Sequence, residues 1–185
     1  PILLVAIFCG LRSSELRGLR WSDIDLEKHQ LHVRQRADRY NAIGAPKSAA
    51  GERTVPFPPL VANALREWKL ACPKGDLGLA FPTGRGAAEY HQNILTRGFF
   101  PAQTAAGVAD AQGKPKYSGL HSLRHFFASW CIARREDGGL GLTAKMTQER
   151  MGHSNISVTL DVYSHLFPAN LGRDERAAAE RRLLG

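Results

Sequence analysis

The hydrophobic period of the chain changes between residues 24 and 34, and this change constrains the fold more than any other feature. The segment IDLEKHQLHVR alternates apolar and polar residues, which is typical of a β-hairpin. A third strand is predicted at 53–57, after the Gly- and Ala-rich loop GAPKSAAGE. Helical spacing of apolar residues surrounds this region, at 1–9, 13–20 and 59–73. The pattern predicts a mainly α fold with one small antiparallel β-sheet (α+β).

The second half of the chain is predicted to be helical. We expect helices over 89–99, 121–135, 143–151, 157–163 and 172–184. The segment 102–119 has no apolar period and is expected to form a mobile loop. With 185 residues, 43% of them hydrophobic, the chain is the size of one well-filled domain.

Charge and cysteine usage limit the functional classes. The formal net charge of +8 suits a polyanionic partner such as nucleic acid, but the basic residues are interspersed with acidic ones, so charge alone is not decisive. Cys9, Cys72 and Cys131 are odd in number and form no C-x-x-C pair, which favours a reducing cytosol over a disulfide framework or a zinc site. The apolar runs are too short for a membrane span. The chain opens inside an apolar helical run, which indicates a fragment of a longer protein.

The segment HSLRHFFASW carries the first candidate site. His121 and Arg124 are three residues apart, so a helix places them on one face, where both could reach one phosphate. Leu123, Phe126, Phe127 and Trp130 are expected to bury the remaining faces. The alternative is that His121 caps the helix and Arg124 is a solvated surface charge.

The segment MGHSNISVTLDVYSHLFP carries the second candidate site. His153 precedes Tyr163 by ten residues, and Gly152 allows a tight approach of the chain just before the histidine. The alternative for Tyr163 is an ordinary core tyrosine whose hydroxyl is satisfied by a hydrogen bond.

Together with GLRSSELRGLRWSDID near the start, these segments resemble the tyrosine recombinases, a family that includes phage and genomic-island integrases. The resemblance covers nearly the whole chain. Its pattern is an arginine in a G-L-R-x-x-E-L turn, a lysine in a β-hairpin loop, H-x-L-R-H on a helix, G-H before a polar stretch, and then a tyrosine. All five occur here in that order. The run RREDGGLGLTAK lengthens the segment between H-x-L-R-H and G-H and is interpreted as a loop insertion.

The resemblance implies a catalytic role for each motif residue. Arg12 and Arg124 would clamp the non-bridging oxygens of the scissile phosphate. Glu15 would support the site by orienting an arginine, with a solvated helix-face charge as the alternative. Lys47 would protonate the leaving 5′ oxygen, although a contact with the DNA backbone is nearly as consistent.

The remaining three residues would act at the nucleophile and the phosphate. Tyr163 would attack the phosphate to give a 3′-phosphotyrosyl link and a free 5′ hydroxyl. His121 would help proton transfer at Tyr163, and His153 would donate a hydrogen bond to the phosphate. His125 and His165, which flank catalytic positions, are interpreted as packing or backbone-bonding residues. No metal, ATP or other cofactor is implied, and His29, His32 and His91 lack a recognised ligand spacing.

The partners that the resemblance implies are double-stranded DNA at attachment or core sites and other copies of the chain, in a homotetramer on DNA. The isolated fragment is a candidate monomer. We expect residues 1–185 to be the catalytic domain, with the N-terminal DNA-binding domains absent, and the protein to act in a bacterial cytoplasm. Leu171, Leu183 and Leu184 are candidates for a contact with a neighbouring copy or for closing the protomer's own core. The rival functions are a type IB topoisomerase and a non-catalytic DNA-binding regulator.

Overall fold

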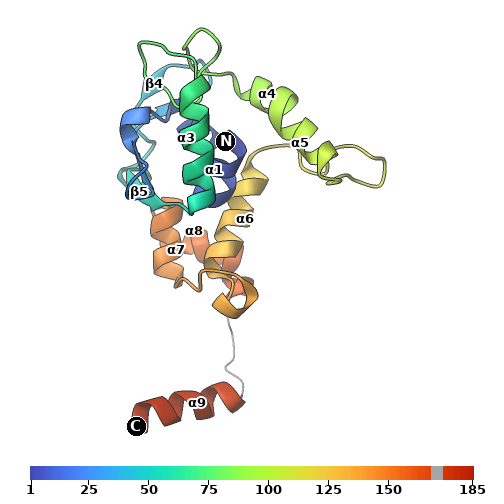
Figure 1. Ribbon diagram of the computed structural model, residues 1–185. Helices are drawn as coiled ribbons and strands as arrows, with labels where there is room; N and C mark the ends of the chain where they lie inside the picture. Colours follow the sequence, from blue (N-terminus) through green and yellow to red (C-terminus); the bar gives the residue numbers. More distant parts are fainter. Residues whose placement is uncertain (168–172) are drawn as a thin grey trace.

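The computed structural model describes residues 1–167 and 173–185, and Figure 1 shows their arrangement. Helices dominate, with two small antiparallel sheets in the first third of the chain. The elements are α1 (Ile2–Cys9), α2 (Ser13–Gly18), β1 (Ile24–Asp25), β2 (Gln30–Val33), β3 (Arg36–Ala37), β4 (Ile43–Gly44), β5 (Arg53–Pro56), α3 (Pro59–Ala71), α4 (His91–Ile94), α5 (Phe100–Ala105), α6 (His121–Ile132), α7 (Ala144–Met151), α8 (Ile156–Tyr163) and α9 (Arg173–Leu184). A single π-helical turn, Leu95–Phe99, joins α4 to α5. The predicted fold class is confirmed.

The alternating segment forms the main sheet. Its strand order is β1-β2-β5, and Leu31 pairs with Ile24 on one side and with Val55 on the other. Leu31 and Val33 are buried, whereas Gln30 and His32 are partly exposed. The period of two therefore confirms the predicted hairpin and the third strand.

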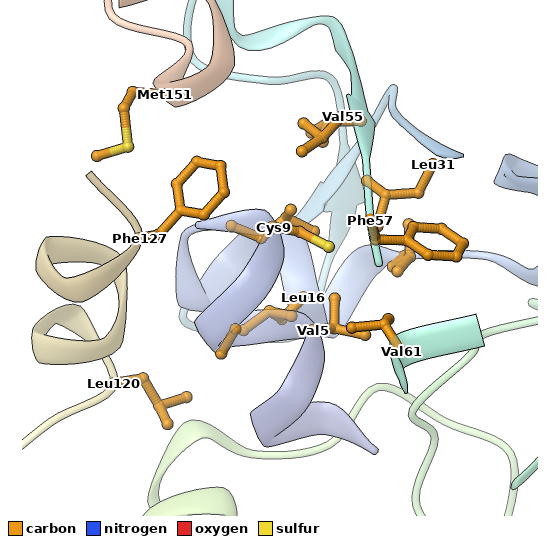
Figure 2. Close-up of a cluster of buried hydrophobic side chains, with 14 of the residues drawn as sticks. Val5, Cys9, Leu16, Leu31, Val55, Phe57, Val61, Leu120, Phe127 and Met151 are labelled. Carbon is orange, nitrogen blue, oxygen red and sulfur yellow. The ribbon is translucent and has the colours of Figure 1, made fainter. Parts of the chain in front are cut away.

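The core is centred on α1, whose residues are apolar on all sides. Val5, Ala6 and Cys9 are buried in it, and strands, α2, α3 and α6 contribute the side chains around them (Figure 2). Gly10 ends α1 with a φ of 60°, and a Cβ there would lie 2.1 Å from the ring of Phe127 on α6. The absence of a side chain lets the end of α1 lie directly against α6, which positions the main-chain carbonyl of Gly10 for the site.

Four sequence-based expectations need correction. The helix predicted over 121–135 ends at Ile132. On that helix Phe127 is buried, but Phe126, expected to be buried too, is 51% exposed. The segment 102–119, expected to be a loop throughout, begins with the end of α5, and Gln103 fixes it by bonding the backbone N–H and carbonyl of Tyr117. The pair β3–β4 was missed because two-residue strands are too short to show a period.

Two further observations concern the surface. Among the described residues, none of the helices combines the length and apolar character that crossing a bilayer demands. In α9, Leu183 and Leu184 are 84% and 76% exposed, so neither closes the core of the protomer in this structure. Leu171 lies outside the described residues.

Candidate catalytic site

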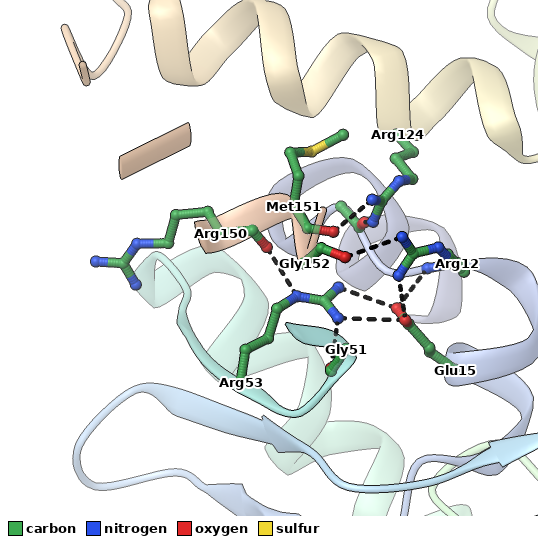
Figure 3. Close-up of polar contacts among 9 residues, drawn as sticks. Arg12, Glu15, Gly51, Arg53, Arg124, Arg150, Met151 and Gly152 are labelled. Carbon is green, nitrogen blue, oxygen red and sulfur yellow. Dashed lines mark hydrogen bonds and ion pairs between the residues drawn. The ribbon is translucent and has the colours of Figure 1, made fainter. Parts of the chain in front are cut away.

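Arg124 projects from α6 into the interior. Its side chain is 2% exposed, and its two Nη atoms donate hydrogen bonds to the carbonyls of Gly10 and Met151 (Figure 3). These carbonyls stand at the C-terminal ends of α1 and α7, where helices leave carbonyls without partners. Arg124 is therefore not the solvated surface charge that the alternative interpretation required.

Arg12 lies beside Arg124 and is held by Glu15. The Nη1 of Arg12 donates to Glu15 Oε1 at 2.8 Å, its backbone N–H donates to Oε2 at 2.8 Å, and its Nη2 donates to the carbonyl of Gly152 at 3.0 Å. Glu15 is 3% exposed, so its alternative as a solvated charge is wrong. The side chain of Arg12 is 36% exposed, which leaves it accessible to a ligand.

Arg53 is a member of this cluster that the sequence interpretation did not assign. It forms a bidentate ion pair with Glu15, with N–O distances of 2.9 and 3.2 Å. Its Nε also donates to the carbonyl of Arg150 at 2.8 Å and its Nη1 to that of Gly51 at 2.9 Å. The signal was available: Arg53 shares a face of β5 with the buried Val55, and a charge on a buried face needs partners.

Arg53 joins three parts of the site. Through Glu15 it contacts the partner of Arg12, through Gly51 it anchors the loop that carries Lys47, and through Arg150 it fixes the end of α7. The chain then turns at Gly152, with a φ of 63°, toward His153.

His153 follows this turn and is partly buried. Its Nδ1 lies 2.9 Å from Oγ1 of Thr159, a fully buried residue of α8. Desolvation, followed by the positive charges of Arg124 and Arg12, lowers the pKa of His153 to about 4. At neutral pH His153 is therefore uncharged, and the contact with Thr159 leaves Nε2 for a ligand.

Tyr163 is the last residue of α8 and is 5% exposed. Its hydroxyl lies 2.6 Å from Nδ1 of His125, one helical turn after His121 on α6. The rings of His121 and His125 are perpendicular, with centroids 4.6 Å apart. The structure thus places His125 directly against the hydroxyl and His121 against the ring of His125. The i, i+4 spacing of the two histidines was the signal that could have identified His125.

Lys47 lies at the edge of the same surface. It is exposed, in the loop between β4 and β5, and with Arg12 and His121 it lines a cavity of about 830 Å³. Among the described residues, no hydrogen bond holds its ammonium group, and its catalytic role stays a prediction.

The cluster is strongly cationic. Burial, and then the charges of Arg12 and Arg53, lower the pKa of Arg124 to about 9, which still leaves it protonated at neutral pH. Burial opposes ionisation of Glu15, but hydrogen bonds and charge from Arg53, followed by those from Arg12, outweigh it and lower its pKa. Two of the three guanidinium groups thus pair with one carboxylate, and a phosphodiester would supply a further negative charge.

Within residues 1–167 and 173–185, no group of three or more His, Cys, Asp or Glu side chains is arranged to hold a metal ion. The groups that converge are donors, a tyrosine and histidines. This combination suits phosphate chemistry by hydrogen bonding and charge neutralisation.

The chain belongs to the phage integrase family, whose sequence model matches residues 2–170. It is therefore the catalytic domain of a tyrosine-type site-specific recombinase. Among curated relatives, it is 31% identical over 191 residues to a XerC-like tyrosine recombinase of Caldanaerobacter subterraneus subsp. tengcongensis, covering 90% of this chain and 45% of that protein. It is 28% identical over 169 residues to the ICEBs1 integrase of Bacillus subtilis, covering 89% and 44%. The chain thus spans about half the length of the curated relatives it matches.

Solved structures agree on the fold. The Tn1549 transposon integrase in complex with transposon right end DNA superposes with a TM-score of 0.67 at 25% identity, covering 99% of this chain and 58% of that one. The catalytic domain of bacteriophage HP1 integrase gives a TM-score of 0.52 at 22% identity, covering 91% and 75%.

Proposed function

We propose that the protein containing this domain cuts and rejoins DNA at specific sites through a 3′-phosphotyrosyl intermediate, and integrates or excises a phage or genomic island. The observation that carries the proposal is a pair of arginines held by main-chain carbonyls, together with a buried tyrosine whose hydroxyl contacts His125, the residue after Arg124. An arginine is suited to this task because its planar, permanently charged fork matches two phosphate oxygens.

In the proposed reaction Arg12 and Arg124 neutralise the non-bridging oxygens as the transition state forms, and Glu15 orients Arg12. His153 donates a hydrogen bond from Nε2 to the phosphate. This assignment is supported by its neutral state and by Thr159, whose hydroxyl can donate to Nδ1 and so leave the proton on Nε2.

Tyr163 attacks phosphorus, and Lys47 protonates the departing 5′ oxygen. The bond energy is retained in the tyrosyl ester, so a second strand can be joined without ATP. His121, at the edge of the cavity that it shares with Arg12 and Lys47, is proposed to assist at the reacting groups.

We further propose that the active assembly is a homotetramer on double-stranded DNA in a bacterial cytoplasm, and that residues 1–185 supply the catalytic domain. The solved structures of the Tn1549 integrase and of the XerH recombinase are complexes of those proteins with DNA. The exposed Leu183 and Leu184 support a contact between copies, because two adjacent exposed leucines are a candidate surface for burial against another chain.

The test is covalent trapping. The full-length protein is incubated in EDTA-containing buffer with a nicked suicide duplex made from the boundaries of its genetic element, and adducts are separated on a denaturing gel. The parent is expected to form an adduct, and Tyr163→Phe is expected to form none.

Two other outcomes would change the assignment. Firm DNA binding by the parent without an adduct would favour the non-catalytic regulator. An adduct accompanied by relaxation of supercoiled DNA, but without exchange between two sites, would favour the type IB topoisomerase.

A further experiment would separate an integrase from a XerC-like resolvase, because the relatives include both kinds. It compares strand exchange on phage or island boundaries with strand exchange on chromosomal resolution sites.

A further inference from the structure

The hydroxyl of Tyr163 has a defined partner before any DNA is bound. His125 Nδ1 lies 2.6 Å from it, and the two ring centroids are 5.7 Å apart. The contact joins two helices, since Tyr163 ends α8 and His125 lies in the first half of α6. The proposed role of Tyr163 as a nucleophile uses this hydroxyl, but it does not say where its proton goes.

The proton needs an acceptor in contact with the oxygen. Burial raises the pKa of Tyr163 above its ordinary value of about 10, although the charge of Arg124 opposes the rise. The hydroxyl therefore remains protonated at neutral pH until a base takes its proton. Histidine is the side chain best suited to accept and return a proton in this pH range.

We infer that His125, rather than His121, removes the proton of Tyr163 during DNA cleavage and returns it during rejoining. This inference rests on the proposed function. Its basis is the direct contact of His125 with the nucleophilic oxygen, whereas His121 packs perpendicular to the His125 ring.

The step balances without a further reactant. His125 begins as the tautomer with its proton on Nε2, so Nδ1 accepts the phenolic proton. The Tyr163 oxygen then forms its bond to phosphorus, the bond from phosphorus to the 5′ oxygen breaks, and the Lys47 ammonium gives that oxygen a proton. In rejoining, the attacking 5′ hydroxyl returns its proton to Lys47, and the imidazolium of His125 gives its proton back to Tyr163.

The surroundings of His125 favour one positive imidazole rather than two. Desolvation, then the charges of His125, Arg124 and Arg12, lower the pKa of His121, so it stays neutral at neutral pH. Among the described residues, ionisable groups near His125 include Tyr163 from α8 and His121 from α6 itself. Lys116 and Tyr117, from the loop before α6, line one cavity with both histidines. None of these four groups is a carboxylate.

The test separates the base from the leaving-group acid. Single-turnover adduct formation by the full-length protein is measured on the suicide duplex and on the same duplex with sulfur replacing the bridging 5′ oxygen. The sulfur leaves without an acid, so it is expected to rescue Lys47→Ala. His125→Asn keeps a polar atom near the position of Nδ1 but is not a base. We expect it to react about 100- to 1,000-fold more slowly than the parent at neutral pH on both substrates.

The pH profile supplies a second readout. The deficit of His125→Asn is expected to shrink toward about pH 9, because hydroxide then replaces the missing base. His32→Asn, which alters a histidine on β2 that bonds Thr54, is the matched control and should retain the parent rate. Binding of the uncleaved duplex should be unchanged, since His125 is exposed and its replacement leaves the core intact.

Three results would overturn the inference. The first is a rate for His125→Asn within about threefold of the parent, and the second is rescue of that variant by sulfur. The third is a rate deficit that shrinks as the pH rises in His121→Asn but not in His125→Asn. Each leaves the proposed function standing, because the parent still forms its adduct. Failure of the parent to form an adduct on either duplex would remove the proposed function, and the inference with it.

Discussion

Replacement of Glu15 by Gln is expected to destabilise the domain more than any other single isosteric change in the cationic cluster. Glu15 is 3% exposed and binds two arginines, and the side chain of its partner Arg53 is only 6% exposed. The amide keeps the shape of the carboxylate but removes the negative charge, and it turns an N–H group toward an N–H donor. Removing one partner of a buried ion pair costs about 3–5 kcal/mol.

That loss is a large part of the roughly 5–15 kcal/mol that stabilises a domain. For a chain of this size it corresponds to a fall in Tm of roughly 6–20 °C, measured by circular dichroism at neutral pH. Glu27→Gln, in the exposed turn between β1 and β2, is the matched control and should change Tm by less than about 2 °C. The pKa of Glu15 is lowered in the folded state, so its contribution is present above the unfolded pKa and is lost as the pH falls through the folded one. The Tm of Glu15→Gln should therefore fall less steeply than that of the parent as the pH is lowered. A Tm equal to that of the control at neutral pH would refute the reasoning.

Three further predictions concern neighbouring positions. Gly152→Ala should cost about 1–3 kcal/mol in urea denaturation, because φ is 63° and the new Cβ would lie 2.8 Å from the Nη1 of Arg53; an unchanged midpoint would contradict this. Since the folded pKa of His153 is lowered to about 4, protons bind preferentially to the unfolded chain between about pH 6.5 and 4, so stability should fall across that range. His153→Gln should reduce this fall, and a parallel pH curve would be inconsistent with the depressed pKa. Phe127→Ala should cost about 3–5 kcal/mol in the same denaturation assay, whereas Phe126→Ala, at an exposed position, should cost less than about 1 kcal/mol, and equal losses would contradict the burial assignment.

The sequence predicted those features that leave a local pattern. The period of two identified β2 and its partners, and helical spacing identified α3 and α6, because each segment has one face on the core. The motif residues Arg12, Glu15 and Arg124 do come together in space. Their catalytic roles stay predictions.

What escaped prediction depends on contacts between distant segments. Arg53 pairs with Glu15, 38 residues earlier, and His125 contacts Tyr163, 38 residues later. Nothing within a few residues of either one indicates its partner. Phe126 was misplaced for a related reason: the apolar residues of α6 nearly surround the helix, so spacing alone could not tell which of them faces solvent.

The anchoring of Arg124 on two main-chain carbonyls also links folding to ligand binding. These carbonyls accept hydrogen bonds from Arg124 but carry no net charge that could neutralise it. The DNA-free domain therefore retains mutual repulsion among Arg12, Arg53 and Arg124. An anion that occupies the cluster relieves this repulsion only in the folded chain, because only folding gathers the three side chains. By mass action, occupancy at about 100 times the dissociation constant adds about 2.7 kcal/mol to the free energy of unfolding. The substrate backbone would thus also act as a stabilising counterion for the fold.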